Sequence, residues 1–166
     1  MSPSPPYAVD STFLDRVEQV VDWTLERGMV AVLNTHHDEW LETNFTLALP
    51  RFVALWTQIA ERFATKAEDL LFEVYNEPHV AAFTADDLNA MNKAALAAIR
   101  VENPTRIVLF GGLAYMNPGW VVANPDAMEI PSDDSQLMLE IHNYVRAVKS
   151  EEEEEGRRGE GRRRRD

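Results

Sequence analysis

Segments with helical spacing alternate with short apolar runs along most of this chain, and this alternation constrains its fold more than any other feature. From Ser11 to Arg27 the apolar residues recur at helical spacing, with Asp10 or Ser11 able to cap the start and Gly28 able to close the end. The run from Met29 to Asn34 is continuous and rich in β-branched residues, which predicts a strand buried on both faces. A helix followed by such a strand is typical of parallel α/β folds.

The same alternation continues toward the C-terminus. The expected elements are a helix opened by Pro50, a strand from Leu70 to Tyr75, a helix that begins at a capping box of Thr84 and Asp87 and stops before Pro104, a strand from Arg106 to Phe110, a loop from Ala114 to Ser135 and a strand from Leu137 to Ile141. Trp23 and Trp56 are expected in the core because they lie in helical apolar stripes. Strands and helices at this spacing imply right-handed crossovers and a parallel sheet, so the predicted class is α/β.

Charge and composition narrow the function classes. The 166 residues carry 16 Lys and Arg against 28 Asp and Glu, a net charge of -12, which repels phosphate backbones and anionic lipids and disfavours nucleic acid or a membrane surface as a partner. The longest apolar runs fall far short of the roughly 20 residues of a membrane span. The chain has no cysteine, and residues 1–6 lack the pattern of a secretory signal.

The last sixteen residues differ from the rest. Residues 151–166 hold seven acidic residues, six arginines, three glycines and no apolar residue, so they are expected to form a disordered tail. Because that segment has a net charge of only -1, the remaining -11 belongs to residues 1–150, which are expected to form one domain.

Polar residues gather where three of the expected strands end. The sequence reads NTHHD at 34–38, YNEPH at 75–79 and HNY at 142–144. Ligands of parallel sheets bind beyond the carboxyl ends of the strands, so these three groups are expected to meet at one edge. Two alternatives stay open at this point: the histidines could be polar caps, or His36, Glu77 and His142 could bind zinc in a metal-dependent hydrolase.

Glu77 has the clearest chemistry. A carboxylic acid at a strand end, followed by Pro78 and held in a partly closed cleft, is expected to have a pKa raised by desolvation, and so to donate a proton near neutral pH. Asn76 is able to hydrogen-bond a substrate hydroxyl. His142 and Tyr144 are expected to set the charge and orientation of a second carboxylate.

These three groups resemble the ends of the third, fourth and sixth strands of glycoside hydrolase family 5, the cellulase family of (β/α)8 retaining hydrolases. The resemblance rests on residues 32–38, 72–79 and 141–144, and Asn-Glu-Pro is its most specific part. It implies that Glu77 is the general acid/base and that Asn76 contacts the sugar 2-hydroxyl. Three other active-site positions would be His36, His142 and Tyr144, with His37 and Trp40 as neighbours.

The resemblance covers about residues 7–148, which would correspond to strands three to six of a TIM barrel, whereas a whole barrel takes about 250 residues. Retaining hydrolysis needs two carboxyl groups about 5 to 5.5 Å apart. The family's nucleophilic glutamate on the seventh strand has no counterpart in this sequence. Glu73 would lie about 13 Å deeper than Glu77 along its strand, and Glu140 about 7 Å deeper than His142, so neither is expected to replace it.

Aromatic rings stack on sugars, and Trp40 and Trp120 are placed in loops that could line a cleft, although either could simply pack beneath its loop. The resemblance therefore implies a polysaccharide hydrolase of endo-β-1,4-glucanase type that needs no metal or cofactor, from a family that is extracellular. The alternative for this chain is a glycan-binding fragment without turnover. Four strands of an open barrel would also expose two sheet edges, which favours self-association.

Overall fold

The computed structural model describes residues 1–144, so the expected tail at 151–166 and the expected domain end at residue 150 lie outside the described residues. The described part contains a parallel sheet whose strands are ordered as they follow one another in sequence. These strands are β1 (Ala31–Asn34), β2 (Leu70–Glu73), β3 (Val108–Gly111) and β4 (Leu137–Glu140). The expected α/β class with a parallel sheet is confirmed.

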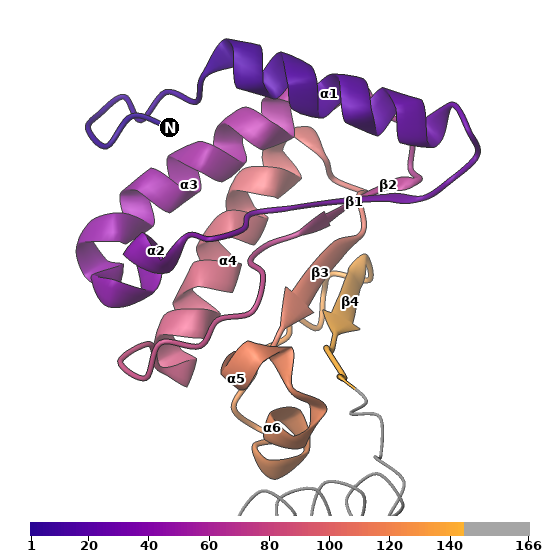
Figure 1. The fold of residues 1–166 in the computed structure, drawn as a ribbon. Coiled ribbons are helices and arrows are strands. Elements are labelled where there is room, and N and C mark those ends of the chain that lie inside the picture. The colour runs from indigo at the N-terminus through magenta and orange to yellow at the C-terminus, as the bar shows by residue number, and fades with distance from the viewer. Residues whose placement is uncertain (145–166) are drawn as a thin grey trace, which may run out of the picture.

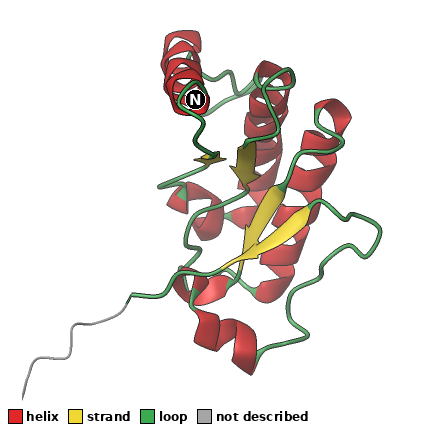
Figure 2. Ribbon diagram, turned by 90° about the vertical axis from the view of Figure 1, so that its right-hand side faces the viewer, coloured by secondary structure: helices red, strands yellow, loops and turns green. Residues whose placement is uncertain are grey.

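Three long helices accompany the sheet: α1 (Ser11–Leu25), α3 (Phe45–Arg62) and α4 (Ala85–Glu102). Figure 1 shows α3 and α4 side by side along the sheet, and Figure 2 shows the strands in front of these helices. The short helices are α2 (Glu39–Thr43), α5 (Leu113–Met116) and α6 (Pro118–Ala123). The last two lie beyond the arrowhead of β3, at the carboxyl end of the sheet (Figure 1). None of the helices within residues 1–144 has the length and apolar character that a bilayer span requires.

The core lies between the sheet and the helices α3 and α4. Phe52 and Trp56 of α3 and Phe72 of β2 are fully buried there, and Phe110 of β3 is 1% exposed. The Trp56 ring lies 5.4 Å from that of Phe72, and its indole N–H donates to the carbonyl of Val74. Burial of each such side chain contributes about 1.5 to 3 kcal/mol, so this layer anchors β2 and β3 and thereby their carboxyl ends.

The local start and stop signals of the helices are borne out. The side chain of Asp10 accepts from the backbone N–H of Phe13 at the start of α1. Thr84 and Asp87 form the reciprocal capping box at the start of α4, and that helix ends two residues before Pro104. Such signals depend only on neighbouring residues, which is why the sequence reveals them.

Other expectations were wrong. Pro50 lies inside α3, which begins at Phe45. Proline has no backbone N–H, so the helix lacks one hydrogen bond there, and it tolerates this loss close to its start. The helix α2 was not expected, and the loop 114–135 begins with most of α5 and contains α6. Trp23 is 43% exposed, with the Arg16 guanidinium over its ring, whereas Trp56 is buried as expected.

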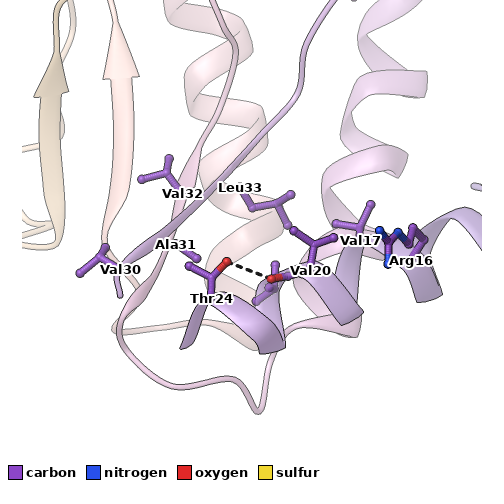
Figure 3. A pocket seen from close by; sticks show the side chains of 9 residues that line it. Arg16, Val17, Val20, Thr24, Val30, Ala31, Val32 and Leu33 are labelled. Atoms are coloured by element: carbon purple, nitrogen blue, oxygen red, sulfur yellow. Dashed lines mark hydrogen bonds between the residues drawn. The ribbon is translucent and has the colours of Figure 1, made fainter. Parts of the chain in front are cut away.

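The strand β1 is not buried on both faces, contrary to expectation. Val30 is 58% exposed and Val32 49% exposed. The reason is that Ala31 and Leu33 face the core, so Val30 and Val32, which alternate with them, lie on the opposite face. The strand also pairs on one side only, with β2. An apolar hollow of about 400 Å³ lies between α1 and β1, with Val17, Val20 and Leu33 in its lining (Figure 3).

Arg106 stabilises the end of the sheet at which the strands begin, opposite their carboxyl ends. Its guanidinium is 7% exposed and donates from Nη1 to the carbonyls of Ala67 and Leu70, and from Nη2 to those of Phe63 and Lys66. Its Nε donates to the side chain of Asn103. One side chain thus provides hydrogen-bond donors for four backbone carbonyl groups of the segment that leads from α3 into β2.

Candidate active site

Glu77 lies just beyond β2 and its carboxylate is held by the segment that follows β4. Its Oε1 atom accepts from Nδ1 of His142 at 2.7 Å and from the hydroxyl of Tyr144 at 2.7 Å. The backbone of Glu77 has a φ of 52°, a left-handed conformation that costs energy for a residue with a side chain. The turn at the end of β2 thus directs this carboxylate toward the end of β4.

These two hydrogen bonds lower the pKa of Glu77 below its usual value. The largest cause is the bond from His142, followed by that from Tyr144, and together they outweigh the desolvation of a side chain that is 23% exposed. The expectation of a raised pKa was therefore wrong for the residues described. His142 and Tyr144 orient Glu77 itself, and not a second carboxylate as expected.

His142 faces two carboxylates. Its Nε2 atom lies 3.5 Å from Oε1 of Glu140, two residues earlier in the chain, while Nδ1 bonds to Glu77. The pKa of His142 is raised, chiefly by the bond with Glu77 and less by Glu140. A neutral imidazole carries one N–H, so only the imidazolium donates to both sides.

The turn after β3 sets the backbone of His142. Ala114, Tyr115 and Met116 all have positive φ angles of 55° to 63°, which bring Met116 back over Gly111. A Cβ atom at Gly111 would lie 2.2 Å from Cε of the buried Met116, so any larger residue there would displace the Met116 side chain. The carbonyl of Met116 then accepts from the backbone N–H of His142 at 2.9 Å.

The histidines after β1 reach the same edge. His36 is exposed, and its positive charge, when present, helps to lower the pKa of Glu77. His37 has a φ of 60°, its ring meets that of His36 edge to face at 4.2 Å, and its side chain is 81% exposed. The backbone N–H of Asn76 donates to the carbonyl of Thr35, which joins the ends of β1 and β2. The three polar groups predicted from the sequence thus lie at one edge of the sheet.

The two tryptophans are partly packed into the fold. The indole N–H of Trp40 donates to Asp38 at 2.7 Å, and the Arg51 guanidinium lies 4.1 Å from the centre of its ring. Trp120 packs against Gly112, where an added Cβ would lie 2.8 Å from Cε3 of the indole. Both rings support their loops, and each remains partly exposed.

Sequence reasoning missed the residues that join the loops after β2 and β3. Glu42 is 2% exposed, and its carboxylate accepts from the hydroxyl of Tyr75 and from the backbone N–H groups of His79 and Val80. The His79 ring stacks on Tyr115 at 4.6 Å. Glu42 lies in α2, the helix that no local signal announced, so only the fold reveals its role.

No group of three or more His, Asp or Glu side chains within residues 1–144 is placed to hold a metal ion. The zinc alternative used His36, Glu77 and His142. In the structure, Nδ1 of His142 is already bonded to Glu77, and its Nε2 faces Glu140. The arrangement does not favour that alternative.

Comparisons with known proteins all point to the same protein family. The profile of the cellulase family, glycosyl hydrolase family 5, matches residues 1–164. Endoglucanase H of Acetivibrio thermocellus is 47% identical over 139 residues, which cover 84% of this chain and 15% of that protein. A hyperthermophilic endo-beta-1,4-glucanase solved in complex with substrate superposes with a TM-score of 0.80 at 33% identity, covering 87% of this chain and 44% of that one.

A further solved structure, Thermotoga maritima Cel5A in complex with cellobiose, has a TM-score of 0.79 at 31% identity and is covered over 45% of its length, by 86% of this chain. The chain therefore spans less than half the length of these relatives. Its parallel strands correspond to part of a TIM barrel, as expected from the sequence. Because the family profile matches nearly the whole chain and the strand arrangement agrees with the solved structures, the chain belongs to glycosyl hydrolase family 5, the cellulase family.

Proposed function

We propose that residues 1–144 carry the acid/base and sugar-binding part of a retaining endo-β-1,4-glucanase site. The observation that supports this most directly is the carboxylate of Glu77, which accepts from both His142 and Tyr144 at the carboxyl edge of the sheet. The names of the relatives, endoglucanase H among them, support the same reaction class. Polysaccharide is the proposed partner, with β-1,4-glucan first, and no cofactor is required.

In this proposal Glu77 works in two steps. Its carboxylic acid first protonates the leaving glycosidic oxygen while a second carboxylate attacks the anomeric carbon and forms a glycosyl ester. The ionised Glu77 then takes a proton from the water that breaks this ester, which returns both carboxyl groups to their starting state. The lowered pKa favours the ionised form. A negative nucleophile about 5 to 5.5 Å away would raise it again, because like charges disfavour each other.

We place this nucleophile outside residues 1–144. Glu73 precedes Glu77 by four residues and Glu140 lies behind His142, so both are deeper in the sheet than the proposed sugar position. Asn76, His36 and His37 are proposed to contact the sugar, and the exposed parts of Trp40 and Trp120 to line its path. The chain alone is therefore proposed to be a glycan-binding fragment without turnover.

Binding without hydrolysis is the first expected result. The chain should bind cellotetraose in isothermal titration calorimetry and release no reducing sugar from carboxymethyl cellulose. Asn76→Ala and His36→Ala should each weaken binding about tenfold, since each removes a hydrogen bond worth about 1 to 1.5 kcal/mol. Asn44→Ala serves as the matched control, because it removes an exposed amide that makes no side-chain cap hydrogen bond at the start of α3.

Two outcomes would contradict this proposal. If the wild-type chain binds no cello-oligosaccharide, or if Asn44→Ala weakens binding as much as Asn76→Ala, the sugar site is not where we place it. Release of reducing sugar that disappears in Glu77→Gln would mean that the nucleophile lies within the chain.

We also propose that the 166-residue chain associates with a second copy of itself. The exposed apolar residues of its two outer strands, Val32 in β1 and Met138 and Leu139 in β4, lie on sheet edges that nothing in residues 1–144 pairs. Two copies would supply eight parallel strands, the number that closes a TIM barrel. Light scattering after size-exclusion chromatography should give about twice 18.9 kDa, and Val32→Lys should reduce it. A monodisperse 18.9 kDa species would refute self-association.

A further inference from the structure

Two carboxyl groups that the proposed reaction does not use, those of Glu73 and Glu140, lie on the face of the sheet opposite the core. Phe72 points into the core beneath α3, so its neighbour Glu73 points to the opposite face. Leu137 packs against the core, so Glu140, three residues on, also points to that opposite face. The two carboxylates therefore share one side of the sheet.

Both groups are only partly satisfied. Oε2 of Glu73 accepts from the side-chain amide of Asn34 at 3.0 Å, whereas its Oε1 is buried without a hydrogen-bond partner. Oε2 of Glu140 is likewise buried without a partner. Two ionised carboxylates in this position would repel each other in a poorly solvated environment.

A proton on Glu73 relieves this repulsion. Glu73 is 4% exposed, and its burial, followed by the charge of Glu140, raises its pKa to about 7. The hydrogen bond from Asn34 acts in the opposite direction and is weaker than these two effects. Glu73 thus keeps a proton under mildly acidic conditions, which removes its like charge from beside Glu140.

Glu140 in turn faces His142, whose other nitrogen bonds to Glu77. The two distances, 3.5 Å from Nε2 to Glu140 and 2.7 Å from Nδ1 to Glu77, put the imidazole between two carboxylates. The side chains of His142, Glu77 and Glu140 are each 20% to 23% exposed, so their interaction is partly shielded from water.

We propose that Glu140 is a positioning residue for the acid/base carboxylate: it faces Nε2 of His142 and so helps to hold His142 as the imidazolium that donates from Nδ1 to Glu77. This inference rests on the proposed role of Glu77. Its consequence is that the resting site keeps Glu77 ionised and oriented toward the end of β4. The charged and titratable groups around His142 are Glu73, Glu77, Glu140 and Tyr144, and His36 acts on Glu77 from the end of β1.

The test is the protonation of His142, followed by NMR of its imidazole carbons across a pH titration of the full chain. Glu140→Gln should lower the midpoint of this titration by about one pH unit, because it removes one of two nearby negative charges. Glu102→Gln removes the same charge from an exposed position at the end of α4 and should leave the midpoint unchanged.

A second measurement uses the wild-type chain and so does not depend on a variant that folds. The side-chain carboxyl carbon of Glu73 should titrate near pH 7. Equal midpoints for Glu140→Gln and Glu102→Gln, or a Glu73 carboxyl that is already fully ionised at pH 5, would overturn the inference. Neither measurement involves sugar, so a failure to bind cello-oligosaccharide would count against the proposed function alone.

Discussion

Replacing Arg106 by methionine is expected to lower the free energy of unfolding by about 4 kcal/mol, a loss at the upper end for a single substitution. The buried guanidinium donates to four backbone carbonyls and to Asn103, and methionine fills the space without replacing any donor. The carbonyl of Phe63 would keep the backbone N–H of Lys66, whereas the buried carbonyl of Leu70 would lose the donor that Arg106 supplies. Urea unfolding followed by tryptophan fluorescence measures the loss.

Arg16→Met is the matched control. Arg16 lies on α1, over the exposed ring of Trp23, so its loss should cost less than about 1 kcal/mol. Arg106→Lys should recover little of the stability, because one ammonium cannot reach the carbonyls that the planar guanidinium spans. An Arg106→Met variant that unfolds at the same urea concentration as the wild type would show that the turn before β2 does not depend on this side chain.

Glu73→Gln is expected to stabilise the protein by about 3 kcal/mol at pH 8 and to have little effect at pH 4. The pKa of Glu73 is about 7 in the folded chain against an ordinary value of 4.5, so the folded state retains a proton that the unfolded state has released. Wild-type stability therefore falls as pH rises from about 4.5 to 7. Glutamine resembles the protonated acid and can still accept from Asn34.

The measurement is the difference in unfolding free energy between wild type and Glu73→Gln at a series of pH values. Glu102→Gln again provides an exposed carboxylate for comparison, and its difference from the wild type should stay flat with pH. The prediction fails if the wild type and Glu73→Gln lose stability in parallel between pH 5 and pH 8.

Local signals in the sequence were sufficient for much of the fold. The capping box at Thr84 and the cap at Asp10 depend on residues within one turn, and both are found. The expected helix start at Pro50 was wrong, because proline favours the first turn of a helix but is also tolerated further inside one, as it is in α3. The expectation for Trp23 was wrong because this position of the apolar stripe of α1 is not covered by the core: the side chain is 43% exposed beneath the Arg16 guanidinium.

The position of the site could also be predicted, since parallel strands deliver residues 34–38, 75–79 and 142–144 to one edge. The electrostatics of the site could not be predicted from the sequence. The pKa of Glu77 depends on two donors that lie 65 and 67 residues away in sequence, and spacing gives no distance between them. The same holds for Glu42, whose three hydrogen bonds arise only once α2 lies beside the end of β2.

The turn that seats Met116 over Gly111 has a consequence for engineering of specificity. Loops at the carboxyl edge of such folds are attractive for transplantation between enzymes, since each follows a different strand. Here the carbonyl of Met116 fixes the backbone of His142, and Tyr115 stacks on His79 and donates its backbone N–H to Pro78. A graft that exchanges residues 112–117 alone would misalign its neighbours, so the three loops need to be transplanted as one unit.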